Sequence, residues 1–202
     1  QLVVYMDAAM EMLRGQHPKK EILPGGILYY HIDDPVLESD TPLSDEEAEQ
    51  ALLFALRPDG LVNSGEEIYR AMDQNFEGKS QMIPVEIKKN GEISTARSKV
   101  ASTEEFAVIT RYVEHEIRQC GEAIYAGNIA VNPYRSDIET SCTYCPYASV
   151  CGMDAKIPGY EYRQFASMKK EEVLDQMQTE LARNRGKEER SDEMDEGTAE
   201  RH

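Results

Sequence analysis

The chain has 202 residues, and its 22 Lys and Arg against 38 Asp and Glu give it a formal net charge of −16. Its hydrophobic content of 40% is enough to build a core, which excludes a wholly disordered chain. No signal peptide is visible, and no apolar run reaches the roughly 18 residues that a membrane-spanning helix needs. We therefore expect a soluble, cytoplasmic protein without a membrane partner. The acidity argues against a protein that binds nucleic acid through a broad basic surface.

The first 32 residues predict a helix followed by a strand. Residues 1–14 carry a broad apolar face, and because they open on Gln1 without an initiator Met, we expect the sequence to be part of a longer chain. Residues 22–32 predict a strand whose apolar run is too continuous for one exposed face. Both faces of this strand are therefore expected to be buried.

The next segment predicts two short helices and a hairpin. Each helix is expected to begin with a capping box, in which a serine and a glutamate three residues later satisfy each other's backbone N–H groups. These pairs are Ser44 with Glu47 and Ser64 with Glu67. Residues 82–87 and 93–96 predict a hairpin whose turn is Asn90-Gly91.

A long helix is predicted over residues 103–126, and Ser102 with Glu105 forms its capping box. One apolar stripe runs along it, made of Phe106, Ile109, Val113, Ile117, Cys120 and Ile124. Its position on this stripe predicts that Cys120 packs into a core.

The C-terminal part of the chain divides into a final helix and a tail. Residues 169–185 predict an amphipathic helix, and residues 186–202 are expected to form a disordered acidic tail. The elements together predict a mixed, helix-rich α/β fold.

Three of the four cysteines form a C-x2-C-x5-C run, made of Cys142, Cys145 and Cys151. A tight turn at this spacing converges thiolates on one point, which is typical of a metal or iron–sulfur site. A disulfide with a free thiol, or three buried cysteines, is the alternative, although no secretion signal supports a disulfide. The fourth ligand of such a site would be Cys120 or would lie outside this sequence.

A second motif, Q-x-x-x-Y, spans Gln1 to Tyr5 on the first helix. Together with the cysteine run it resembles the RecB-type nucleases of the PD-(D/E)xK superfamily that carry an iron–sulfur staple. The closer resemblance, over residues 1–165, is to the C-terminal region of the B subunits of AddAB-type helicase–nucleases. It is carried by residues 24–32, 60–62, 129–135 and 142–151.

The resemblance implies that residues 1–168 are the C-terminal part of a nuclease domain stapled by a 4Fe–4S cluster. Cys142, Cys145 and Cys151 would bind that cluster, with a fourth cysteine upstream of this sequence. The Mg²⁺-binding carboxylates and the lysine of the active site would precede Gln1, so that the chain alone would be inactive. Gln1 and Tyr5 would lie beside that site.

For the parent protein, the resemblance implies a bacterial, ATP-dependent helicase–exonuclease. It would work with an AddA-like subunit on double-strand DNA ends. It would degrade the 5′-ended strand for recombinational repair.

Three alternatives accompany this interpretation. Glu86-Ile87-Lys88 is formally an E-x-K, but charged and apolar residues alternating on a solvated strand explain it better. A stand-alone CRISPR-associated nuclease of the same superfamily would share the motif order, although the distance between Tyr5 and Cys142 argues against it. A non-enzymatic interaction module with a four-cysteine zinc site, completed by Cys120, is the third.

Overall fold

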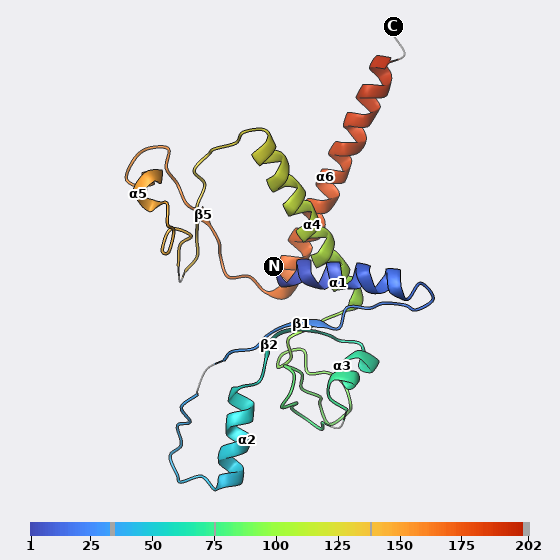
Figure 1. Cartoon of the computed structure of the whole chain (residues 1–202), viewed down its shortest axis with the longest axis vertical. Coiled ribbons are helices and arrows are strands. Elements are labelled where there is room, and N and C mark those ends of the chain that lie inside the picture. The colour runs from blue at the N-terminus through green and yellow to red at the C-terminus, as the bar shows by residue number, and fades with distance from the viewer. Residues whose placement is uncertain (33–34, 75, 138, 200–202) are drawn as a thin grey trace. The chain divides into compact units, whose positions relative to one another are not determined.

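The computed structural model describes residues 1–32, 35–74, 76–137 and 139–199 (Figure 1). The chain divides into two compact units, Gln1–Val113 and Glu114–His202. The long helix α4 (Thr103–Tyr125) runs through the boundary between them.

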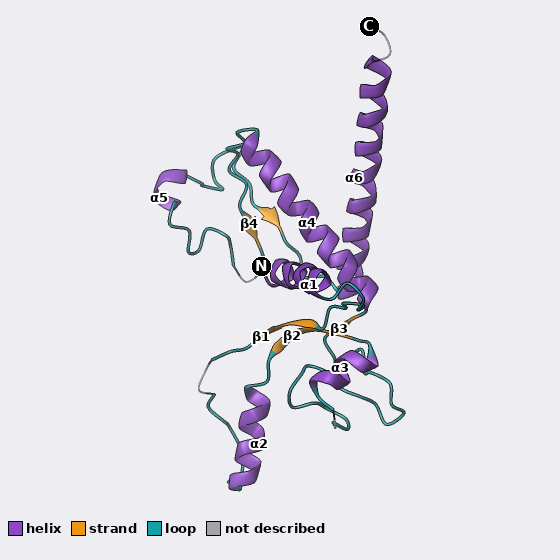
Figure 2. Ribbon diagram, turned by 45° about the vertical axis from the view of Figure 1, so that its right-hand side comes forward, coloured by secondary structure: helices purple, strands orange, loops and turns teal. Residues whose placement is uncertain are grey.

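The first unit is built on a three-stranded sheet. Besides the start of α4, the elements of this unit are α1 (Leu2–Gln16), β1 (Gly26–Tyr29), α2 (Asp45–Ala55), β2 (Asp59–Asn63), α3 (Glu66–Met72) and β3 (Val100–Ala101). The strand order is β1-β2-β3, with β1 antiparallel and β3 parallel to the central strand (Figure 2). Helix α1 contacts β1, and the core gathers side chains from the sheet, α3 and the loop after α3. Its members are Val62, Tyr69, Phe76, Ile83, Val85, Ile87 and Val100.

A glycine allows two strands of the sheet to approach closely, and a buried asparagine hydrogen-bonds the end of the central strand to other elements. Gly60 pairs with Leu28 at a φ of +148°, and a Cβ there would overlap the carbonyl oxygen of Ile27, so a larger residue would push β1 and β2 apart. The buried Asn63 amide donates to the Pro24 carbonyl oxygen at 2.8 Å and to the Thr103 hydroxyl at 3.0 Å. One side chain therefore ties the end of β2 to the approach to β1 and to the start of α4.

Local sequence signals explain how two of the helices begin. Ser44 and Glu47 form the expected capping box at α2. At α4 the Ser102 N–H donates to the Glu105 carboxylate at 2.7 Å, and the Glu105 N–H donates to the Ser102 hydroxyl at 3.2 Å. Both predictions are confirmed.

The capping box expected from Ser64 is wrong. Helix α3 begins after Gly65, without a side-chain cap. The Asn63 side chain accepts from the Gly65 N–H at 2.8 Å instead. The same Asn63 side chain that holds the sheet end therefore also binds the backbone just before α3.

Two strand predictions are only partly correct. β1 is shorter than residues 22–32, and it is not buried on both faces, because Tyr29 and the following Tyr30 are exposed. The turn at Gly91 forms, with a φ of +85° and its N–H donating to the Lys88 carbonyl oxygen at 2.9 Å. The flanking residues make one isolated bridge, Ile87 to Ile93, rather than a regular hairpin.

The second unit contains the rest of α4 and β4 (Tyr134–Arg135), α5 (Ala148–Cys151), β5 (Arg163–Gln164) and α6 (Lys170–Ala199). Strands β4 and β5 pair in parallel, Tyr134 with Arg163 and Arg135 with Gln164. The Asn184 amide lies 2.8 Å from His115 Nε2, which joins α6 to α4. Over residues 114–137 and 139–184, whose side chains are described, the only buried hydrophobic residue is Leu174.

The expected core position of Cys120 is wrong. The stripe on α4 is covered only near its start, where Phe106 and Val108 are buried. Further along, Ile117 is 53% and Ile124 77% exposed, and Cys120 is exposed with them. A correct helical period therefore predicted which side chains share a face, but nothing in the described part of this chain covers the far end of that face.

The C-terminal helix is longer than expected. The sequence predicts a helix over residues 169–185 and a disordered tail over 186–202, whereas α6 continues to Ala199. The residues of its second half include many with high helix propensity, such as Glu, Lys, Arg and Ala, and no proline. Within the described ranges, no helix has the length and apolarity needed to cross a membrane.

Candidate metal centre

Backbone turns bring the three cysteines of residues 142–151 into one loop, here called the cysteine loop. The Cys145 N–H donates to the Cys142 carbonyl oxygen at 3.3 Å, which closes the first turn. After Pro146, the single turn of α5 carries Cys151, whose N–H donates to the Tyr147 carbonyl oxygen at 2.8 Å. Gly152 then ends this turn in the left-handed conformation, at a φ of +65°.

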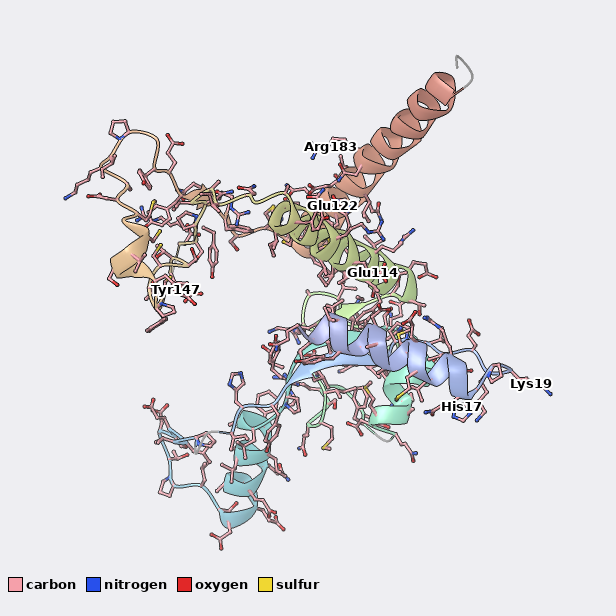
Figure 3. All side chains as sticks on the ribbon, turned by 45° about the horizontal axis from the view of Figure 1, so that its top comes forward. His17, Lys19, Glu114, Glu122, Tyr147 and Arg183 are labelled. Atoms are coloured by element: carbon pink, nitrogen blue, oxygen red, sulfur yellow. The ribbon has the colours of Figure 1, made fainter. Side chains whose placement is uncertain are left out.

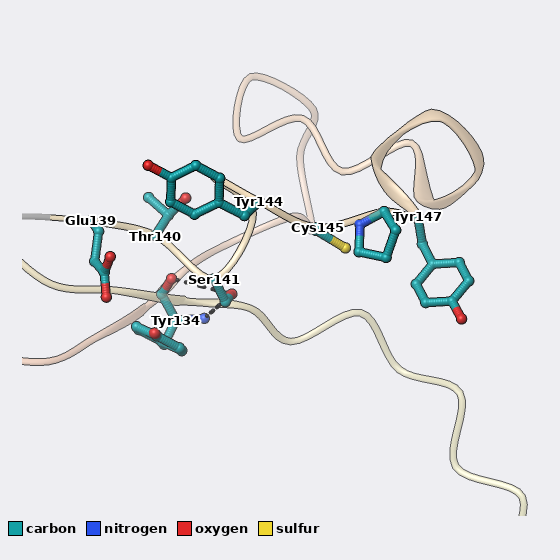
Figure 4. Close-up of a pocket in the computed structure, with 8 residues that line it drawn as sticks. Tyr134, Glu139, Thr140, Ser141, Tyr144, Cys145 and Tyr147 are labelled. Atoms are coloured by element: carbon teal, nitrogen blue, oxygen red, sulfur yellow. Dashed lines mark hydrogen bonds between the residues drawn. The ribbon is translucent and has the colours of Figure 1, made fainter. Parts of the chain in front are cut away.

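The start of the loop is hydrogen-bonded to β4. The Tyr134 N–H donates to the Ser141 hydroxyl at 3.1 Å, and the Ser141 N–H donates to the Tyr134 carbonyl oxygen at 3.1 Å (Figure 4). The Cys142 N–H donates to the Thr140 hydroxyl at 3.2 Å. The first cysteine is therefore positioned by the strand beside it.

The end of the loop returns to the same strand. Tyr162, just before β5, lies with its ring under Arg135, whose guanidinium carbon is 4.3 Å from the ring centroid. A hydrogen bond to Cys142 raises the pKa of the Tyr162 hydroxyl above its usual value, and desolvation adds to this, while Arg135 opposes it.

The thiols suit a soft metal or an iron–sulfur cluster by their chemistry. Cys142, Cys145 and Cys151 are in no disulfide and are half-buried, and thiolates are the ligands that zinc and iron–sulfur clusters prefer. No group of three or more His, Cys, Asp or Glu side chains among the described residues is gathered in a metal-ligating arrangement. The donor set thus fits such a group, while the three sulfurs are not drawn together on one point.

A hollow of about 480 Å³ lies against one side of the cysteine loop. It is lined by Tyr134, Glu139, Thr140, Ser141, Tyr144, Cys145, Pro146 and Tyr147. The rings of Tyr144 and Tyr147 point away from each other on either side of Cys145 (Figure 4) and are 90% and 70% exposed. Figure 3 shows Tyr147 at the outer edge of the loop.

The Q-x-x-x-Y motif lies in the other unit. The Gln1 amide donates to the Tyr5 hydroxyl at 3.1 Å across one turn of α1, as residues four apart on a helix face do. Both side chains are exposed. The pair can therefore contact another chain segment or a ligand, but within this structure the two residues contact each other.

The E-x-K lookalike has a structural explanation. The Glu86 carboxylate pairs with Arg97, with Nη1 and Oε1 2.9 Å apart, while Ile87 is buried and Lys88 is exposed. The expected alternation of apolar and charged residues is present. The ion pair already occupies the carboxylate that a metal would need.

Sequence reasoning missed the contact between Arg135 and Tyr162. Arg135 is exposed, but its guanidinium stacks on the Tyr162 ring. The two residues are 27 positions apart, and only the pairing of β4 with β5 brings them together. No local pattern in the sequence could have found them.

A family model described as "PD-(D/E)XK nuclease superfamily" matches residues 1–152, about three quarters of the chain. The chain belongs to the PD-(D/E)XK nuclease superfamily. The match includes both the Q-x-x-x-Y helix and the whole cysteine loop. The expected fold class is confirmed.

Relatives within this superfamily are long proteins, each named as the B subunit of an "ATP-dependent helicase/deoxyribonuclease". The chain is 38% identical over 181 residues to the one from Thermoanaerobacter sp. (strain X514), covering 90% of this chain and 16% of that protein. It is 38% identical over 182 residues to the one from Lachnoclostridium phytofermentans, covering 86% and 15%. A third, from Clostridium botulinum (strain Hall), is 37% identical over 181 residues, covering 90% and 16%. The chain thus spans about a sixth of the length of these relatives, and the resemblance to B subunits is confirmed.

Proposed function

We propose that this PD-(D/E)XK chain serves the B subunit of an ATP-dependent helicase–deoxyribonuclease, as the later part of its nuclease domain. The observation that carries the proposal is the similarity to proteins of that name over 86–90% of the chain. The superfamily match to residues 1–152 supports the nuclease part of it. The similarity also favours this function over a stand-alone CRISPR-associated nuclease.

The intact protein would process double-strand DNA ends for recombinational repair, together with an AddA-like subunit. ATP would drive the helicase. In the nuclease, Mg²⁺ bound by two carboxylates would stabilise the charge that develops on the phosphodiester as the 5′-ended strand is cut. Gln1 and Tyr5 would lie beside that site, where their exposed polar groups could contact DNA or support the catalytic strands.

Cys142, Cys145 and Cys151 would hold a 4Fe–4S cluster, with a fourth thiolate from a cysteine outside this sequence. Their free, half-buried thiols and their position in one loop support this assignment. The scarcity of buried apolar side chains around them is a second argument, because small regions without a core are commonly stabilised by a metal or by disulfides. The cluster would therefore act as a structural staple.

A zinc interaction module remains the competitor from another functional class, and it needs Cys120 as its fourth ligand. Cys120 is exposed on the helix α4, outside the loop that carries the other three cysteines. This position disfavours the zinc module.

The metal content of anaerobically purified full-length protein distinguishes cluster from zinc. We expect a brown protein whose broad visible absorption is bleached by acid, with iron and sulfide in stoichiometric amounts. Cys145→Ser should abolish the colour, whereas the matched control Cys120→Ser should keep it. A colourless protein that holds one stoichiometric zinc ion, lost on Cys120→Ser, would contradict the cluster.

Nuclease assays test the rest of the proposal. The full-length protein with its partner subunit should degrade linear double-stranded DNA in the presence of ATP and Mg²⁺, and the isolated 202-residue chain should not. Glu86→Ala should leave the activity of the complex unchanged. Activity of the isolated chain that Glu86→Ala abolishes would show that the E-x-K is a true site.

A further inference from the structure

One loop of the first unit has a charge opposite to that of the whole chain. Residues 79–99, between α3 and β3, contain five Lys and Arg against two Asp and Glu, a net charge of +3, whereas the whole chain carries −16. Figure 1 draws this loop in green. The basic residues are Lys79, Lys88, Lys89, Arg97 and Lys99. Positive charge gathered on one segment is typical of a surface that binds a polyanion.

Two of these positive charges are neutralised by ion pairs. Arg97 Nη1 lies 2.9 Å from the Glu86 carboxylate. Lys99 Nζ lies 2.7 Å from the Asp59 carboxylate. A third charge, the Lys79 ammonium, lies 3.8 Å from the centroid of an aromatic ring at the end of α2. The two basic residues that remain are adjacent in the sequence.

These two residues, Lys88 and Lys89, carry uncompensated charge. Both are exposed, and among the described residues neither ammonium group is in an ion pair. The Glu92 carboxylate, three residues further along, accepts from the Asn90 amide at 2.9 Å and is thus partnered by a neutral group. Two like charges side by side repel each other, and an anionic ligand between them removes this repulsion.

The turn that carries the two lysines is fixed by its backbone. The Lys88 N–H donates to the Glu92 carbonyl oxygen at 2.8 Å, and the Gly91 N–H donates to the Lys88 carbonyl oxygen at 2.9 Å. Just before the turn, Ile87 is buried in the core, and its N–H donates to the Gly78 carbonyl oxygen at 2.7 Å. Because the backbone is already ordered, binding a ligand here costs the ordering of two side chains and not of a loop.

We propose that residues 88–91, here called the basic turn, bind the phosphate backbone of the DNA strand that the nuclease domain processes, through Lys88 and Lys89. The inference rests on the proposed function, because the polyanion is the DNA that the intact protein would degrade. It gives the lysine of the E-x-K lookalike a role in binding that needs no metal. Contacts with phosphates position a strand and carry no sequence information. An acidic chain can thus hold DNA through one local group of positive charges.

The salt dependence of DNA binding tests this inference. In the full-length protein with its partner subunit, Lys88→Gln combined with Lys89→Gln removes both charges and keeps the backbone hydrogen bonds of the turn. The affinity for a duplex end with a long 5′ single-stranded tail is measured at several salt concentrations, without ATP and Mg²⁺ so that no DNA is cut. On single strands each lost phosphate contact reduces the slope of log K against the logarithm of the salt concentration by about 0.7. We therefore expect the double variant to reduce the slope by about 1.4.

Lys19→Gln combined with Lys20→Gln is the matched control. These lysines are also adjacent and exposed, and they lie in a turn of the first unit beyond the end of α1, where Figure 3 labels Lys19. The control has the same change of charge, and its slope should equal that of the wild type.

The outcomes separate this inference from the proposed function. A slope that is unchanged in the Lys88 and Lys89 variant, or equally reduced in the control, would overturn the DNA contact and leave the degradation of linear DNA in place. An unchanged slope with weaker binding of the partner subunit would also overturn it, and would assign the basic turn to a protein interface. A wild-type complex that neither binds nor degrades linear DNA would overturn the proposed function, and the inference with it.

Discussion

Each of the two units of this chain is stabilised internally by a different kind of interaction. The first has a sheet whose central strand contributes the fully buried Val62, and around it lie most of the buried hydrophobic side chains of the described residues. In the second, the residues around the cysteine loop are joined by hydrogen bonds, an aromatic pair and a cation–π contact. A hydrophobic core stabilises its unit without help, whereas a loop with few buried apolar side chains depends on cross-links, and here the thiols can supply them.

The largest effect is expected from removing the proposed cluster. Acid or a chelator should release iron and make residues 128–168 sensitive to protease, because binding free energy at structural metal sites is also folding free energy, on the order of 10 kcal/mol for zinc-finger peptides. The sheet of the first unit should keep its protection. Limited proteolysis with mass spectrometry measures both units in one sample. Equal protection of residues 128–168 with and without metal would remove the distinction between the units.

A large effect is also expected at the buried start of α4. Phe106 is fully buried, so Phe106→Ala should lower the free energy of unfolding of the first unit by about 3–5 kcal/mol. Ile124→Ala, on the exposed end of the same helix, should change it by less than about 0.5 kcal/mol. Urea unfolding of both variants measures the difference. A cost at Ile124 close to that at Phe106 would mean that the far end of the stripe is also buried in solution.

A smaller effect is expected from a helix cap. Ser102→Ala removes the hydroxyl that accepts from the Glu105 N–H and should cost about 1 kcal/mol. Ser64→Ala is its control, because α3 has no side-chain cap although the sequence there has the same spacing of serine and glutamate. Thermal unfolding of the two variants should therefore differ by several degrees for the first unit. Equal costs would show that Ser64 caps α3 after all.

The smallest effect concerns the pH dependence of the sheet. Lys99 Nζ lies 2.7 Å from the Asp59 carboxylate, and this hydrogen bond lowers the pKa of Asp59 below its ordinary value. A carboxyl group whose pKa is lower in the folded state stabilises the fold above its unfolded pKa, and this stability is lost as the pH falls through the folded value. Because both side chains are largely exposed, the contribution should be below about 1 kcal/mol. Asp59→Asn should lower the free energy of unfolding at pH 7, and this difference should disappear as the pH falls through the folded-state pKa of Asp59, which lies below its ordinary value. A difference that persists in acid would assign the effect to packing.

Features that depend on contacts between residues close together in the sequence could be predicted, and features that depend on distant residues could not. The capping residues of α2 and α4 act across three positions, and the turn at Gly91 needs only its own backbone, so these features are visible in the sequence. The cap expected at Ser64 is absent because α3 begins one residue later, after Gly65, whose N–H donates to the Asn63 side chain. Cys120 failed because helical periodicity shows which side chains share a face and does not show whether anything covers that face.

The sequence by itself determined the kinds and order of most elements, the cysteine spacing and, through its motifs, the nuclease superfamily. Tertiary structure decided that β4 pairs with β5, that Asn63 joins three elements, and that Arg135 stacks on Tyr162. The reason is physical. Contacts within a helical turn or a tight turn form from neighbouring residues, whereas a contact between residues roughly 20 to 40 positions apart depends on loop closure and on every packing contact that holds the loop ends together.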